Sequence, residues 1–172
     1  AHRAAAEFYA EQLSSPAAQV ARRLLAERGF DQNAAVHFSV GFAPSTWDAL
    51  TRHLRGRGFT DDELRIGGLA RDGQRGLVDR FRGRLMWPIR DITGEVIGFG
   101  ARRLLGEDTG PKYLNTPETP LYKKSQVLYG VDLAKREIAR RMQAVVVEGY
   151  TDVMACHLAG VPTAIATCGT AF

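Results

Sequence analysis

The 172-residue chain carries a formal net charge of +4, with 45% hydrophobic and 24% charged residues, the balance of an ordinary globular protein. No apolar run is long enough to span a bilayer and no signal-peptide pattern opens the chain, so we expect no membrane partner. The two cysteines lack the spacing of a disulfide framework or a zinc site, and we expect a cytoplasmic protein. The modest basic excess suits an acidic polymer as partner.

The first third of the chain reads as short helices. Apolar spacing predicts helix over residues 1–29, interrupted where Pro16 can open a second helix. Residues 36–40 have the pattern of a strand. A further helix is predicted from Ser45, and Thr60 with the acids after it is typical of a capped helix start. These elements predict local packing rather than a catalytic centre.

Residues 80–103 alternate arginines with apolar side chains and turn at Thr93-Gly94, which predicts a basic antiparallel β unit after a turn at 71–73. Two interpretations stay open. The arginines could form the wet side of a sheet. Alternatively, Phe81, Trp87 and Phe99 between them could stack on a nucleic-acid strand.

Residues 110–120 contain three prolines and no periodicity, which predicts a loop. Loops often carry function, so its lysine and tyrosine are of interest. Residues 131–142 have the spacing of an amphipathic helix, which leads into the next strand.

A β-branched run, residues 145–147, ends on Glu148 and is followed by Gly149, a helical pattern and a second strand at 163–167. This order predicts a β-α-β unit, with the first strand covered on both faces. Glu148 and the turn at 168–170 would lie at the carboxyl ends of the strands, where ligands gather. With Asp152 one helical turn away, the two carboxylates could bind Mg²⁺. Equally, both acids could simply stabilise the helix start.

In order, these motifs resemble the bacterial replicative primase of the DnaG type, at the start of its RNA polymerase core. The resemblance covers essentially the whole chain, and the Lys-Tyr-Leu-Asn-x-Pro-Glu-Thr loop is its most specific part. Glu-Gly-x-x-Asp alone is shared across the toprim superfamily. The matching stretches are residues 25–29, 41–44, 80–84, 88–91, 96–102, 111–119, 128–130 and 147–153.

The fold class implied is α/β: an α+β N-terminal subdomain with a basic antiparallel sheet over residues 1–143, then the opening β-α-β of a truncated toprim domain over 144–172. The function implied is synthesis of short RNA primers on single-stranded DNA by nucleotidyl transfer. In the family, further Asp-x-Asp carboxylates follow this point. We therefore expect the 172 residues alone to be inactive.

The resemblance also implies roles for individual residues. Glu148 matches the catalytic, metal-binding carboxylate, and Asp152 the second metal-binding acid, for Mg²⁺ or Mn²⁺; zinc belongs only to an N-terminal domain that this sequence lacks. Expected partners are single-stranded DNA, ribonucleoside triphosphates, the RNA–DNA hybrid and, through an absent C-terminal region, the replicative helicase. The location implied is the bacterial nucleoid or replisome. Positions matching those that hold template or nucleotide are Arg28, Arg82, Arg84, Arg102, Lys112, Tyr113 and Lys124.

Two alternatives accompany this assignment. A toprim nuclease or topoisomerase would share Glu148 and Asp152, although the Lys112-Tyr113 loop and the arginine-rich unit argue against it. A non-catalytic single-strand-binding module would need only the basic residues.

Overall fold

A computed structural model describes residues 1–104, 106 and 108–169, so Thr170 of the expected turn lies outside the described residues. No helix in this described part is long and apolar enough to cross a bilayer. The helices are α1 (His2–Gln12), α2 (Gln19–Glu27), α3 (Gln32–His37), α4 (Ala49–Gly56), α5 (Asp61–Ile66), α6 (Val131–Arg141) and α7 (Tyr150–Leu158), with single turns at Pro16–Ala18 and Lys124–Gln126. The strands are β1 (Gly41–Ala43), β2 (Ala70–Gly73), β3 (Gly76–Asp79), β4 (Arg84–Arg90), β5 (Val96–Arg103), β6 (Tyr113–Asn115), β7 (Leu128–Tyr129), β8 (Val145–Val147) and β9 (Ala164–Thr167).

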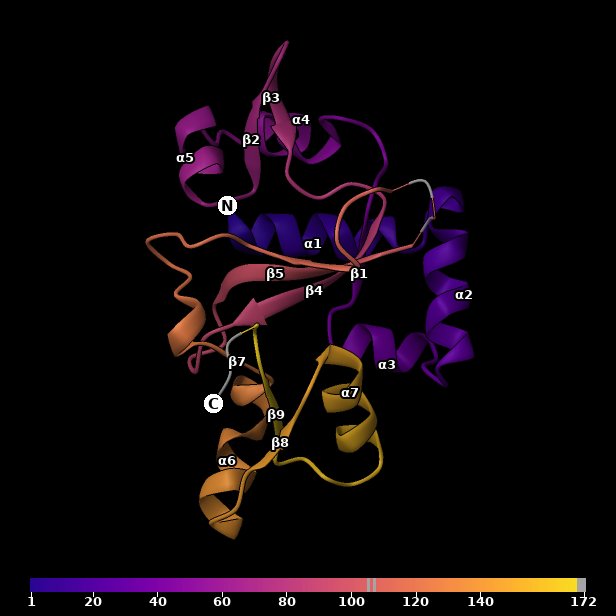
Figure 1. Ribbon diagram of the computed structural model, residues 1–172, viewed down its shortest axis with the longest axis vertical. Coiled ribbons are helices and arrows are strands. Elements are labelled where there is room, and N and C mark those ends of the chain that lie inside the picture. The colour runs from indigo at the N-terminus through magenta and orange to yellow at the C-terminus, as the bar shows by residue number, and fades with distance from the viewer. Residues whose placement is uncertain (105, 107, 170–172) are drawn as a thin grey trace.

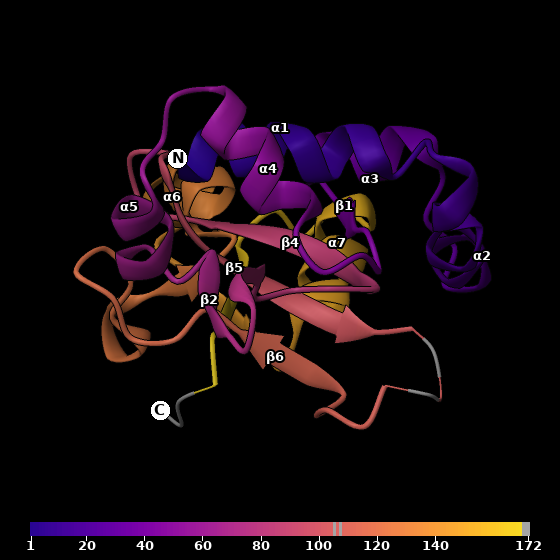
Figure 2. The same ribbon diagram turned by 90° about the horizontal axis from the view of Figure 1, so that it is seen from above.

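A four-stranded antiparallel sheet, ordered β1-β4-β5-β6, forms the middle of the molecule (Figure 1). The β4–β5 hairpin with its turn at residues 93–94 is the one predicted. Helices α1 and α4 pack on one face (Figure 2), while Trp87 of β4 points into the core on the other, against α7. Residues 84–89 are all buried, so the expectation of a wet face is wrong for β4, which packs on both sides.

The aromatic residues of this unit are core residues. Phe81, Trp87 and Phe99 are at most 1% exposed, which contradicts the idea that they stack on a nucleic acid. The exposed aromatic side chains nearby are Trp47 and Tyr113, at 61% and 42%. Tyr113 belongs to β6, which forms within the stretch predicted to be loop.

The N-terminal helices break at Pro16 as predicted. The strand predicted over residues 36–40 is wrong, because α3 occupies Gln32–His37. Asp31 caps this helix by accepting a hydrogen bond of 2.8 Å from the N–H of Ala34, and the strand β1 starts only at Gly41. A cap several residues upstream outweighed the local β-branched pattern.

Two further boundaries differ from prediction. Helix α4 begins at Ala49 rather than at Ser45, because Asp79 of β3 accepts from the N–H groups of Leu50 and Thr51. Strands β2 and β3 form a hairpin where only a turn was predicted; it projects at one end of the molecule (Figure 1). The cap predicted at Thr60 is confirmed, since its hydroxyl accepts from the N–H of Glu63.

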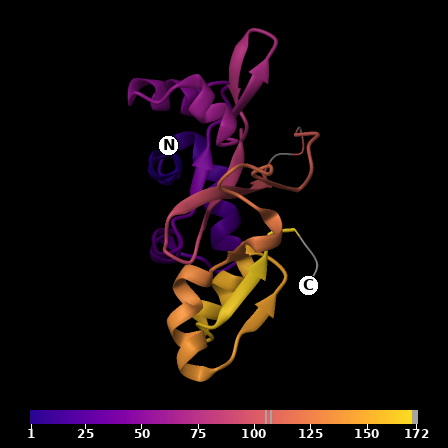
Figure 3. The same ribbon diagram turned by 90° about the vertical axis from the view of Figure 1, so that its left-hand side faces the viewer.

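A second, three-stranded sheet of order β7-β9-β8 lies at the opposite end with α6 and α7 (Figure 3). Strands β8 and β9 are parallel and α7 connects them, which confirms the β-α-β unit. The expected cover on both faces of β8 is wrong, because Val146 is 48% exposed. Strand β7 joins this sheet from the N-terminal side of the predicted 143/144 division.

Candidate functional site

The two carboxylates lie where strand β8 gives way to helix α7. Gly149 is the extended N-cap residue of α7, and its N–H donates to Asp152 Oδ2 over 3.1 Å. Asp152 therefore stabilises the helix start, as the simpler interpretation held. Glu148, immediately after β8, is exposed. Both carboxylates are accessible to a ligand.

A cleft of about 550 Å³ surrounds these acids. Its basic and aromatic side chains come from elsewhere: Arg28 from the C-terminus of α2, and Lys112 and Tyr113 from the start of β6. Five of the predicted site residues thus meet in one place. The lining residues are Arg28, Lys112, Tyr113, Asn115, Glu148, Gly149, Tyr150, Thr151, Asp152, Thr167 and Gly169.

Tyr150, the first residue of α7, lines this cleft and is packed against the central sheet. Its ring stacks on Trp87 with centroids 5.2 Å apart and planes at 9°, and Tyr129 contacts it edge-on at 4.8 Å. Its hydroxyl donates to Asn115 Oδ1 over 2.8 Å. Burial raises the pKa of Tyr150 far above its usual range, so the phenol stays protonated.

Two predicted residues are not among the residues that line this cleft. Arg102 of β5 is paired with Tyr113 in the strand register, and its guanidinium donates to the carbonyl of Arg103. Lys124 starts a single helical turn, where its N–H donates to a Glu118 carboxylate oxygen over 2.8 Å.

The remaining predicted pair, Arg82 and Arg84, lies in a separate cleft of about 700 Å³ together with Arg71 and Arg80. The Arg82 guanidinium lies 3.7 Å from the ring centroid of Trp47, an arrangement that favours cation–π attraction. Burial, followed by the charge of Arg71, lowers the pKa of Arg82, although a guanidinium remains charged at neutral pH.

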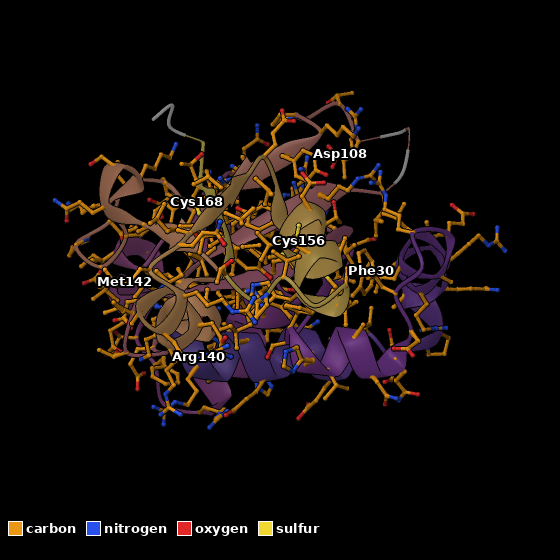
Figure 4. The ribbon with its side chains drawn as sticks, turned by 90° about the horizontal axis from the view of Figure 1, so that it is seen from below. Phe30, Asp108, Arg140, Met142, Cys156 and Cys168 are labelled. Atoms are coloured by element: carbon orange, nitrogen blue, oxygen red, sulfur yellow. The ribbon has the colours of Figure 1, made fainter. Side chains whose placement is uncertain are left out.

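Arg84 itself is only 4% exposed. It forms an ion pair of 2.9 Å with Asp108, which Figure 4 labels at the edge of the molecule. Its Nη1 has no hydrogen-bond partner among the described residues. The N–H groups of Nη1 could therefore donate hydrogen bonds to an anion that enters the cleft.

The described residues contain no cluster of three or more side chains suited to hold a metal ion. The carboxylate oxygens of Glu148 and Asp152 are hard donors in a shared cleft. Because Mg²⁺ is commonly held by one or two carboxylates with water and phosphate oxygens, this pair fits part of a magnesium site.

Two features of these clefts were missed at the level of sequence. Asn115 lies within the quoted loop motif but had no role, and Trp47 was assigned to a helix that starts after it. Trp47 follows Pro44 by three positions and Ser45 by two, a setting that could have identified it as a loop residue.

The geometry defines an α/β protein in which a basic antiparallel sheet meets a strand-end carboxylate cleft. The sequence matches the family described as DNA primase catalytic core, N-terminal domain over residues 8–135, and the Toprim domain over 142–172. This chain belongs to the DNA primase catalytic core family.

Relatives and solved structures agree with this membership. The DNA primase of Streptomyces coelicolor is 69% identical, across the whole of this chain and 27% of the relative. The RNA polymerase domain of Mycobacterium tuberculosis primase DnaG, solved with a double-stranded DNA oligomer with a 6-nucleotide overhang, is 62% identical with a TM-score of 0.98, covering 99% of this chain and 54% of that one. The Escherichia coli primase catalytic core is 41% identical with a TM-score of 0.86, covering 96% and 53%. The chain thus spans about a quarter of the length of its curated relatives.

Proposed function

We propose that this chain forms the N-terminal part of the RNA polymerase core of a bacterial DNA primase, which makes RNA primers on single-stranded DNA in the cytoplasm at the replication fork. The observation that carries the proposal is the shared cleft of Glu148, Asp152, Lys112, Tyr113 and Arg28. Nucleotidyl transfer needs basic side chains that bind phosphates. It also needs nearby carboxylates that hold a metal ion.

Within the cleft, Glu148 and Asp152 would hold Mg²⁺ or Mn²⁺ jointly with groups outside these residues. The ion would supply charge stabilisation at the phosphate undergoing transfer. Lys112 and Arg28 would bind phosphate oxygens of a ribonucleoside triphosphate or of the RNA–DNA hybrid, and Tyr113 would stack on a base. We propose that residues 144–172 begin the toprim unit, although β7 of its sheet precedes that division. The helicase would bind outside the present residues.

The second cleft favours a template-tracking role. Four arginines and an exposed indole, none of them next to the carboxylates, suit a single strand whose phosphates and bases pass without sequence readout. This is also the observation behind a second candidate function, a single-strand-binding module without catalysis. Relatives named as primases favour primase over a toprim nuclease or topoisomerase. Tyr150 is also a poor candidate for a topoisomerase nucleophile, since its phenol is buried and donates to Asn115.

The test is a titration of the chain with fluorescent single-stranded DNA at several salt concentrations, with and without Mg²⁺. We expect salt-sensitive binding without Mg²⁺, and Lys112→Ala should reduce the slope of log K against log salt by about 0.7. Glu148→Gln should leave DNA affinity nearly unchanged while weakening Mn²⁺ binding.

The matched control is Arg140→Ala. Arg140 pairs with Glu137 on α6 and lies at the far side of the molecule from Asp108 (Figure 4). This variant loses the same charge, so it should keep nearly the whole slope. DNA affinity that depends on Glu148 and not on Lys112 would contradict the assigned roles.

A further inference from the structure

The side chain of Asn115 bridges the basic strand β6 and the unit that carries the carboxylates. Its Oδ1 accepts from the Tyr150 hydroxyl over 2.8 Å, and its Nδ2 donates to the carbonyl of Cys168 over 3.2 Å. These partners lie 35 and 53 positions further along the chain. One amide thus joins β6 to the first residue of α7 and to the end of β9, where Figure 4 labels Cys168.

The Tyr150 end of this bridge is closely packed on several sides. The ring is held between Trp87 and Tyr129, and Trp87 in turn donates to the sulfur of Met154 within α7 over 3.3 Å. A Cβ built on Gly100 would lie 2.2 Å from the Tyr150 ring, so backbone and ring are in direct contact. The backbone that carries Glu148 and Asp152, each two residues from Tyr150, is therefore anchored to the central sheet.

The other end of the bridge is less constrained. Strand β6 has three residues, forms the edge of its sheet and pairs with β5 alone among the described strands. Lys112 and Tyr113 stand at its start, and Asn115 ends it. The carbonyl of Asn115 also accepts from Arg80 of the second cleft over 3.0 Å, so this residue lies where the two clefts meet.

We propose that Asn115 is a positioning residue that sets the distance between the phosphate-binding side chains on β6 and the carboxylates beside α7. The inference rests on the proposed function and adds a residue that acts through Tyr150 rather than on substrate. The distance between the phosphate-binding side chains and the carboxylates must be kept constant, because a misplacement of about 1 Å can reduce a rate by about a hundredfold. Without the bridge, β6 keeps its ladder to β5 and the tilted ring contact of Tyr113 with Tyr150 at 6.4 Å, but it loses its side-chain hydrogen bonds to α7 and to the residue after β9.

Asn115 also lines the carboxylate cleft, so direct contact with substrate is the rival explanation. Tyr150→Phe separates the two, since it removes the bridging hydroxyl and leaves Asn115 free to contact substrate. If Asn115 acts through Tyr150, the single variants and the double variant should behave alike.

The experiment compares Asn115→Ala, Tyr150→Phe and the double variant in a chain of the relatives' full length that carries these residues. We expect each single variant to lower kcat for primer synthesis by about tenfold with little change in KM, and the double variant to lose about tenfold rather than about a hundredfold. Hydrogen exchange of the β6 backbone amides should become faster in all three variants. Their affinity for single-stranded DNA should change less than threefold, which is a smaller effect than the tenfold decrease in kcat.

The matched control is Tyr9→Phe. This change also removes a buried phenol hydroxyl, but one without a hydrogen-bond partner among the described residues, and it lies on α1. It should leave kcat and β6 exchange unchanged. Additive losses in the double variant, or unchanged β6 exchange in Tyr150→Phe, would overturn the inference. If the wild-type full-length chain made no primers, the proposed function would be overturned. The hydrogen-exchange data would still decide whether the bridge holds β6.

Discussion

Asp152 accepts a hydrogen bond from the backbone N–H of Gly149, 3.1 Å away, and thereby caps the helix that follows Glu148. The capping bond uses Oδ2, which leaves Oδ1 for a ligand. The two interpretations of this acid, helix stabilisation and metal binding, are therefore compatible. They can be separated by substitution, because one needs only an acceptor and the other needs charge.

Asp152→Asn and Asp152→Ala should affect stability and metal binding differently. Asparagine keeps the oxygen that accepts from Gly149, whereas alanine removes it, so only Asp152→Ala should lower the free energy of unfolding by about 1 kcal/mol. Both should weaken Mn²⁺ binding because both remove the charge. Urea denaturation and Mn²⁺ titration measure the two effects. Equal Mn²⁺ affinity in wild type and Asp152→Asn would exclude this acid from the metal site.

Gly100→Ala should destabilise the protein by about 1–3 kcal/mol, since its Cβ would overlap the ring of Tyr150. In a chain of the relatives' full length, the change should also displace the start of α7 and lower primer synthesis. The matched control is Gly56→Ala in α4, where a Cβ meets nothing within 4 Å. That variant should be neutral or stabilise by up to about 1 kcal/mol. Urea midpoints compare the two, and equal midpoints would mean that the ring has room to shift.

The sequence was sufficient for the elements whose signals are local. The hairpin turn at Thr93-Gly94, the cap at Thr60 and the β-α-β unit after residue 144 were all predicted and confirmed. The meeting of Lys112 with Glu148 in one cleft followed only from resemblance, because nothing local relates a loop to a strand end 36 residues later.

What the sequence could not reveal depends on distant contacts. The arginine-rich β4 looked half-wet because Arg84 is charged, yet it is buried with Asp108 as its partner. The start of α4 was misplaced because its cap, Asp79, comes from a strand about 30 residues away. Exposure of Val146 likewise depends on what packs on β8, which alternation within three residues does not encode.

Asp79 predicts a pH dependence of stability. Burial raises its pKa above the usual 3.8, despite hydrogen bonds from Thr51 and Leu50 that lower it. A folded-state pKa above the unfolded one means that the folded protein binds the proton more tightly. The contribution of Asp79 to unfolding free energy is therefore fully present below pH 3.8 and is lost as pH rises through its folded pKa.

The measurement is the difference in unfolding free energy between wild type and Asp79→Asn from pH 4 to 7, in which other titrating groups largely cancel. Wild type should lose stability relative to Asp79→Asn as pH rises. Because asparagine cannot accept all the bonds that Asp79 accepts, the variant should still be less stable overall. A difference that is constant, or that changes in the opposite direction, would contradict the raised pKa.

The exposed indole of Trp47 under Arg82 should serve as a stacking platform for a single strand. Trp47→Ala should weaken binding of single-stranded DNA by about 1 kcal/mol or more, roughly fivefold, because a base loses its aromatic partner. Arg82→Lys keeps the charge but loses the planar guanidinium, so it should preserve the salt dependence while lowering affinity.

Since Trp47 is 61% exposed, Trp47→Ala should hardly change the urea midpoint, so a loss of DNA affinity in this variant would be a local effect. Fluorescence anisotropy with short oligonucleotides measures the affinities. Unchanged affinity in Trp47→Ala at low salt would mean that the strand passes this cleft without stacking and is held by the arginines alone.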